Sequence, residues 1–93
     1  MNRTERIACA QLYCWLTSSR VEDTRREILT TLKGTDTIPA NVLSDSTNLS
    51  RSTLDNHLRD LDDINVITRK GNPTTIVIEQ ADLIELVLDD TAN

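Results

Sequence analysis

The side chains that could catalyse a reaction or hold a metal are few in this chain of 93 residues. There is one histidine, His57, and the only cysteines are Cys9 and Cys14, five positions apart. This set lacks the ligand spacing of a zinc site. The sequence has no Ser-His-Asp pattern, and two glycines leave no room for a phosphate-cradling loop. We therefore expect no enzyme, no cofactor and no metal site, with both cysteines in the core.

Basic, amide and hydroxyl side chains gather instead between residues 50 and 72, where they could bind a ligand. A guanidinium group can make paired hydrogen bonds with guanine, and an asparagine amide can do so with adenine. Serine and threonine hydroxyls hold phosphates without reading sequence. The candidates are Ser50, Arg51, Ser52, Thr53, Asn56, Arg59, Arg69, Lys70 and Asn72.

The elements that would position these side chains begin with a short helix. Pro39 suits its first helical position, and Val42 and Leu43 are expected to face inward. The run 44–48 is rich in serine, aspartate and asparagine, which favour turns, so we expect it to end the helix. Leu49 would then close the turn from the inside.

A longer helix is expected next, with Ser50 as its N-cap. Leu54, Leu58 and Leu61 recur at i, i+4 and i+7, which predicts one buried face. Asn65 stands where a left-handed residue would end the helix, a conformation that asparagine tolerates.

Two β-branched runs, 66–69 and 74–78, are expected to pair as strands around a turn at 70–73. Apolar periodicity predicts three further helices, from residue 3 or 4 to 16, over 21–33 and over 81–90. The fold class is therefore mainly α with a small β-hairpin. We expect one domain over 1–93, divided into an N-terminal helix in 1–18, a core in 21–78 and a C-terminal helix in 79–93.

The formal net charge is −5, and residues 79–93 alone contribute five acidic side chains and no basic one. No apolar run approaches the roughly 20 residues that span a bilayer, and the N-terminus lacks the pattern of a signal peptide. We expect a cytoplasmic protein without membrane contact. Eight arginines stand against two lysines, and ten aspartates against five glutamates. This bias resembles proteins of salt-loving archaea.

The region from Arg25 to Ile78 resembles the winged helix-turn-helix regulators grouped with ArsR, MarR and Lrp proteins. The matching pattern is Leu43, Leu49-Ser50-Arg51-Ser52-Thr53-Leu54, Leu58, Leu61 and Ile64-Asn65-Val66-Ile67. The family usually has glycine where this chain has Asn65. The resemblance implies a recognition helix over about 50–62 in a DNA major groove and a wing over 66–78 on the backbone or minor groove. It also implies flanking helices that form a dimer.

Helical geometry assigns roles within this resemblance. Ser52, Asn56 and Arg59 point away from the buried leucines, and Arg51 lies near the helix N-terminus, which attracts phosphate. Asn56 could contact adenine, and Arg51 or Arg59 guanine. Ser52 and Thr53 would hold phosphates, and the wing would contribute Arg69, Lys70 and Asn72.

Simpler interpretations exist for the same residues. The polar positions could be ordinary solvated helix surface, and Arg51 and Arg59 could pair with Asp55 or Asp60 on their own helix. His57, on the shoulder of the buried face, is expected to be a packed or capping residue.

A homodimer is a separate hypothesis, since two recognition helices about 34 Å apart would bind a palindromic site. The alternative is that the terminal helices only close the core of one chain. The proposed interface residues are Ile7, Leu12, Trp15, Leu16, Leu83, Ile84, Val87 and Leu88.

The sequence thus favours a sequence-specific regulator of transcription that binds double-stranded DNA. The alternative is a winged helix that docks on another protein and binds no DNA. The basic residues at the contact positions of the motif favour the first of these.

Overall fold

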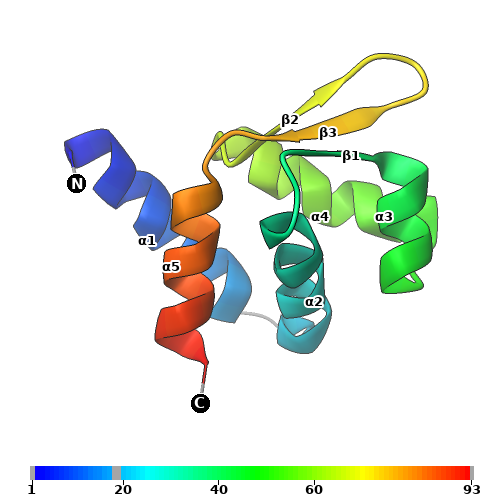
Figure 1. The fold of residues 1–93 in the computed structure, drawn as a ribbon. Coiled ribbons are helices and arrows are strands. Elements are labelled where there is room, and N and C mark those ends of the chain that lie inside the picture. The colour runs from blue at the N-terminus through cyan, green and yellow to red at the C-terminus, as the bar shows by residue number, and fades with distance from the viewer. Residues whose placement is uncertain (1, 18–19, 93) are drawn as a thin grey trace.

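The computed structural model describes residues 2–17 and 20–92 of the chain. In this part of the chain it contains five α-helices and a three-stranded antiparallel sheet, as Figure 1 shows. This confirms the predicted fold class. The elements are α1 (Arg3–Thr17), α2 (Glu22–Lys33), β1 (Thr37–Pro39), α3 (Ala40–Thr47), α4 (Arg51–Asp63), β2 (Ile67–Lys70), β3 (Thr75–Ile78) and α5 (Ala81–Thr91).

The helix-turn-helix is formed by α3 and α4. Asn48 ends α3 in the left-handed conformation, with φ of 56°, and the backbone N–H of Leu49 donates to the carbonyl of Ser44 at 3.1 Å. Ser50 caps α4, because its Oγ accepts a hydrogen bond from the backbone N–H of Thr53 at 3.3 Å. Asn48 and Ser50 therefore fix the angle between the two helices.

Three expectations for α3 were wrong. Pro39 lies in β1 and at the N-cap of α3, one position before the first helical residue. The run 44–47 is helical, because α3 continues to Thr47, whose hydroxyl donates to the carbonyl of Leu43 at 2.8 Å. Val42 is exposed, whereas Leu43 is buried as expected.

The hairpin forms as predicted, and β1 adds a third strand that the sequence did not predict. The strand order is β1-β3-β2, with Thr37 opposite Val77 and Thr68 opposite the same Val77 on the other side. Because β1 leads directly into α3, this pairing ties the start of the helix-turn-helix to the hairpin. Asn65 has φ of 63°, which confirms the left-handed exit from α4.

The core lies between α1, α2, α4, α5 and the inner face of the sheet. Leu54, Leu58 and Leu61 of α4 are fully buried, as the periodicity predicted. In Figure 1, α1 and α5 lie side by side at the end of the molecule away from the hairpin tip, and they contact each other. Cys9 packs partly buried against this core, whereas Cys14 is exposed, so its predicted core position was wrong.

Of the described residues, none belongs to a helix with the length and apolarity needed to cross a membrane. Residues 1, 18 and 93 of the predicted N- and C-terminal segments lie outside the described residues. The division of the chain into 1–18, 21–78 and 79–93 stays a prediction.

Candidate nucleic-acid interface

The outer face of α4 carries a row of polar side chains. Ser52, Asn56 and Arg59 are all exposed, and by the helical period they lie on the side opposite the buried leucines. We call this row the exposed ridge. Its amide and guanidinium groups belong to Asn56 and Arg59, for which the sequence predicts contacts with bases.

The N-terminal end of α4 adjoins this ridge and carries Ser50, Arg51 and Thr53. The hydroxyl of Ser50 is used for capping, since it accepts from the backbone of Thr53 and also donates to the Oγ1 of Thr53 at 2.9 Å. Toward the described part of the chain, the hydroxyl of Thr53 accepts this hydrogen bond and donates none. Arg51 donates from Nη1 to the Oδ1 of Asn41 in α3 at 2.7 Å, which holds its side chain across the two helices of the motif.

Arg69, Lys70 and Asn72, which the sequence assigned together to the wing, lie on different parts of the hairpin. In the register of β2 and β3, Arg69 lies opposite Ile76 and Lys70 opposite Thr75. Successive residues of a strand point to opposite faces, so Arg69 shares the inner face with buried Ile67 and Ile76, and Lys70 points the other way. Asn72 is exposed at the tip.

A hollow of about 290 Å³ lies between α4 and the hairpin, lined by Arg51, Asp55, Asp62, Arg69 and Thr74. Two ion pairs form its walls. The Nε of Arg69 donates to the Oδ2 of Asp62 at 3.0 Å, and the Nε of Arg51 lies 3.6 Å from the Oδ1 of Asp55. The structure therefore brings two predicted contact residues together at the edge of the ridge, each beside a carboxylate.

The fold contains a helix-turn-helix, a capped second helix and a hairpin. A comparison of the sequence with known families gives a result that agrees with this fold. A family model described as winged helix-turn-helix DNA-binding matches residues 21–68, which is 48 of the 93 residues. The chain belongs to the winged helix-turn-helix DNA-binding family. The match runs from the residue before α2 into β2, so it includes both helices of the helix-turn-helix, α3 and α4, and the start of the wing. No curated protein and no solved structure matched the chain significantly.

On the side of α4 that faces α2 lies a partly buried polar cluster, which the sequence did not predict. The guanidinium of Arg25 stacks over Trp15, 4.7 Å from the ring centroid, and donates to the Trp15 carbonyl. Its Nε donates to the Nδ1 of His57 at 3.1 Å, and its Nη2 lies 3.7 Å from Asp60. The cluster ties the winged helix core to α1.

The position of Arg25 could have been read from the sequence. Arg25, Ile28, Leu29 and Leu32 recur at i, i+3, i+4 and i+7, which places the arginine at the start of the buried stripe of α2. His57 is buried and packs edge-to-face with Trp15, which agrees with the expected packed histidine. Burial lowers the pKa of His57 from 6.5, Arg25 lowers it further, and Asp60 opposes both.

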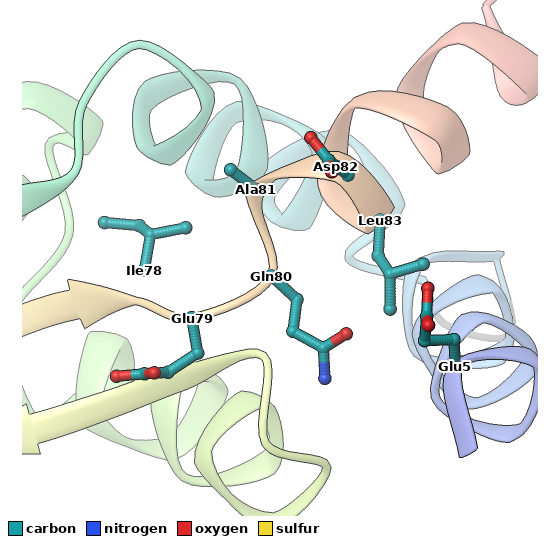
Figure 2. A pocket seen from close by; sticks show the side chains of 7 residues that line it. All are labelled: Glu5, Ile78, Glu79, Gln80, Ala81, Asp82 and Leu83. Carbon is teal, nitrogen blue, oxygen red and sulfur yellow. The ribbon is translucent and has the colours of Figure 1, made fainter. Parts of the chain in front are cut away.

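A second hollow, of about 280 Å³, lies where β3 leads into α5 and faces α1 (Figure 2). Glu5, Glu79 and Asp82 line it together with Gln80. Figure 2 shows the three carboxylates at different edges of the hollow, so they do not converge on one cation. Within residues 2–17 and 20–92, no three histidine, cysteine or acidic side chains are placed to hold a metal.

The proposed dimer residues are mostly part of the core of the single chain. Ile7 is 52% exposed, and the other seven are buried between α1, α5 and their neighbours. The winged helix therefore uses these side chains first to close its own core. The oligomeric state stays a prediction.

Proposed function

We propose that this protein is a transcriptional regulator that recognises a specific sequence in double-stranded DNA, acts without catalysis and works in the cytoplasm. The observation that carries the proposal is the exposed ridge of Ser52, Asn56 and Arg59. It is the outward face of a capped recognition helix in a chain of the winged helix-turn-helix DNA-binding family. In this proposal α4 enters the major groove and the wing lies on the adjacent backbone or minor groove.

Each side chain has a distinct role in the proposal. Asn56 reads adenine and Arg59 reads guanine from the ridge. Ser52, Thr53 and Arg51 hold phosphates at the N-terminal end of α4, where unpaired backbone N–H groups favour anions. Lys70 and Asn72 contact the backbone from the outer face and tip of the wing, and Arg69 does so from its inner face.

The net charge of −5 is compatible with this proposal because of where the acidic side chains lie. All five acidic residues of 79–93 belong to α5 or the segment leading into it. Figure 1 shows α5 beside α1, away from α3 and the wing tip. Repulsion between exposed charges is screened over about 8 Å at physiological ionic strength, so these residues act weakly on DNA at the recognition helix.

We propose in addition that the protein binds a palindromic site as a homodimer. Seven of the eight predicted interface residues are buried in one chain, so a dimer would rest on the apolar side chains left exposed on the terminal helices. Ile7 of α1 is 52% exposed and Leu86 of α5 is 44% exposed. Sedimentation equilibrium of the protein and of Ile7→Glu tests this directly, since only a dimer would dissociate on substitution.

The test of function is fluorescence anisotropy with the DNA upstream of the protein's own coding sequence and with a scrambled duplex, across a KCl titration that reaches molar concentrations. Asn56→Ala and Arg59→Ala should each cost about 1–3 kcal/mol of discrimination between the two duplexes. Arg6→Ala removes one positive charge from an exposed position on α1 and should leave the discrimination unchanged. Equal binding to both duplexes at every salt concentration would favour a protein-docking winged helix.

Arg51→Ala and Arg69→Ala should weaken binding to both duplexes by similar factors, because phosphate contacts carry no sequence information. Their melting temperatures should stay close to that of the unsubstituted protein. Normal binding by both variants would show that the groove assignment is wrong.

A further inference from the structure

Arg51 and Arg69, the arginines that line the hollow beside the exposed ridge, are each paired with an aspartate. Arg69 is held by Asp62 at 3.0 Å, and Arg51 lies 3.6 Å from Asp55. All four side chains are between 32% and 42% exposed, so they are open to solvent and to a ligand. The hollow between α4 and the wing thus carries two positive and two negative charges, which cancel.

The charges cancel because Asp55 and Asp62 lie on the side of α4 that lines the hollow. Asp55 and Asp62 are seven residues apart, so by the helical period they and Arg51 lie within about 40° of one another on the side that faces the wing. The inner face of β2 brings Arg69 to the same side. In the hollow Arg69 therefore meets Asp62, and Arg51 lies beside Asp55.

The hydrogen bond between Arg69 and Asp62 leaves part of the guanidinium group open to a DNA phosphate. Asp62 accepts from the Nε of Arg69, and toward the described residues neither Nη atom of Arg69 donates a hydrogen bond. The outer edge of the guanidinium can therefore meet a phosphate while the carboxylate stays behind it. A phosphate in that place would lie close to a negative charge, which costs free energy at low salt and little when salt screens it.

We propose that Asp55 and Asp62 set the salt dependence of DNA binding by this protein. Asp62 orients Arg69, and each aspartate offsets the charge of the arginine beside it, so that binding is weaker at low salt and declines less steeply as salt rises. This inference rests on the proposed DNA-binding function. Each phosphate neutralised by an uncompensated cation would contribute about 0.9 to the slope of log affinity against log salt, and each aspartate removes much of that contribution.

The decisive variants keep the hydrogen-bond acceptor and remove the charge. Asp62→Asn can still accept from the Nε of Arg69 through its amide oxygen, and Asp55→Asn is the matching change for Arg51. At about 0.1 M KCl each should raise affinity about threefold or more. The gain should disappear near 1 M KCl, where the Debye length falls to about 3 Å, and the slope should steepen by up to about 0.9 for each variant.

Two controls separate this effect from a general change of charge. Asp45→Asn makes the same charge change on α3, the other helix of the motif, where the side chain is exposed and does not line the hollow. Its gain should be clearly smaller. In the Arg69→Ala background, Asp62→Asn should give no gain beyond that of Asp45→Asn. Circular dichroism melting curves establish that each variant is folded at the assay temperature.

The outcomes distinguish the two proposals. If the unsubstituted protein binds DNA and Asp62→Asn binds no better than Asp45→Asn, or gains equally without Arg69, the inference about the aspartates is overturned alone. If no variant binds any duplex at any salt concentration, the proposed function is overturned and the inference with it. If only the asparagine variants at positions 55 and 62 bind at low salt, the inference is supported.

Discussion

The two sides of the recognition helix use the same residue types for opposite purposes. On the side that faces α2, the Arg25 side chain is 16% exposed and contacts Trp15, His57 and Asp60. On the side that faces the wing, Arg51 and Arg69 are 40% and 32% exposed and pair with one aspartate each. Burial and the number of partners decide whether an arginine holds the fold or stays available to a ligand.

The energetic difference follows from desolvation. A buried guanidinium that loses its partners leaves polar groups unpaired, which costs about 1–3 kcal/mol for each group, and its contact with an aromatic ring adds about 0.5–2 kcal/mol. An exposed ion pair contributes about 0–1 kcal/mol, because water and salt replace the lost contact. Substitutions on the two sides of α4 test this contrast, and the largest effect is expected at Arg25.

Arg25→Ala should lower the free energy of unfolding by about 2–4 kcal/mol, since it removes the stacking on Trp15 and the hydrogen bonds to its carbonyl and to His57. Urea unfolding followed by Trp15 fluorescence measures this. Arg26→Ala is the matched control on the same helix, where the side chain is half-buried and bonds to Glu22 and Thr91. A loss for Arg26→Ala as large as that for Arg25→Ala would contradict the special role of the buried cluster.

A smaller effect is expected from protonation of His57. Its Nδ1 accepts from Arg25, and a protonated imidazole cannot accept there. The pKa of His57 is lowered in the folded state by burial and by Arg25, against the opposing charge of Asp60. The unfolded chain therefore takes up the proton first, so stability should be full above the ordinary pKa of 6.5 and should fall as pH drops through the lowered value.

Unfolding titrations from neutral to mildly acidic pH, on the natural chain and on His57→Gln, isolate this contribution. Glutamine keeps an acceptor for Arg25 and does not titrate, so the difference in pH dependence between the two proteins reports His57 alone. Identical pH dependence in both would show that His57 does not resist protonation in the folded state.

The smallest effect is expected on the wing side. Arg69→Ala should change the free energy of unfolding by less than about 1 kcal/mol, and the change should shrink further in high KCl. Guanidinium chloride would itself screen the pair, so urea is the denaturant of choice. A loss of about 2 kcal/mol or more, well above the range of an exposed ion pair, would mean that the wing depends on this contact, and the contrast between the two sides would then fail.

The recognition helix was well predicted because its signals are local. A serine cap, leucines at i, i+4 and i+7, and an asparagine at the exit act within a few residues of the chain, and all three agree with the structure. The strand β1 was missed because it has three residues and depends on pairing with β3, far along the chain. The continuation of α3 through Thr47 was missed because the serine and threonine hydroxyls donate to carbonyls in and after the helix instead of ending it.

The candidate contact residues could be chosen from the sequence, but their partners could not. Side-chain types and helical period place Asn56 and Arg59 outward without any tertiary information. Arg69 meets Asp62 and Lys70 does not. This difference depends on the register of the hairpin and on where the wing lies against α4. The burial of Arg25 could have been predicted, because its spacing continues the apolar stripe of its helix. It was not predicted because arginine is usually exposed.

The pairing of α1 with α5 has a consequence for synthesis of the protein. Leu12 and Leu16 of α1 belong to the same buried core as Leu83, Ile84 and Val87 of α5, a helix that contacts α1 and is made much later. On the ribosome, the helix-turn-helix and wing can be complete while α1 still presents an apolar surface without its cover. The nascent chain must therefore wait for residues 81–91 to emerge before its core is closed, and stalled or truncated chains would be targets for chaperones and proteases.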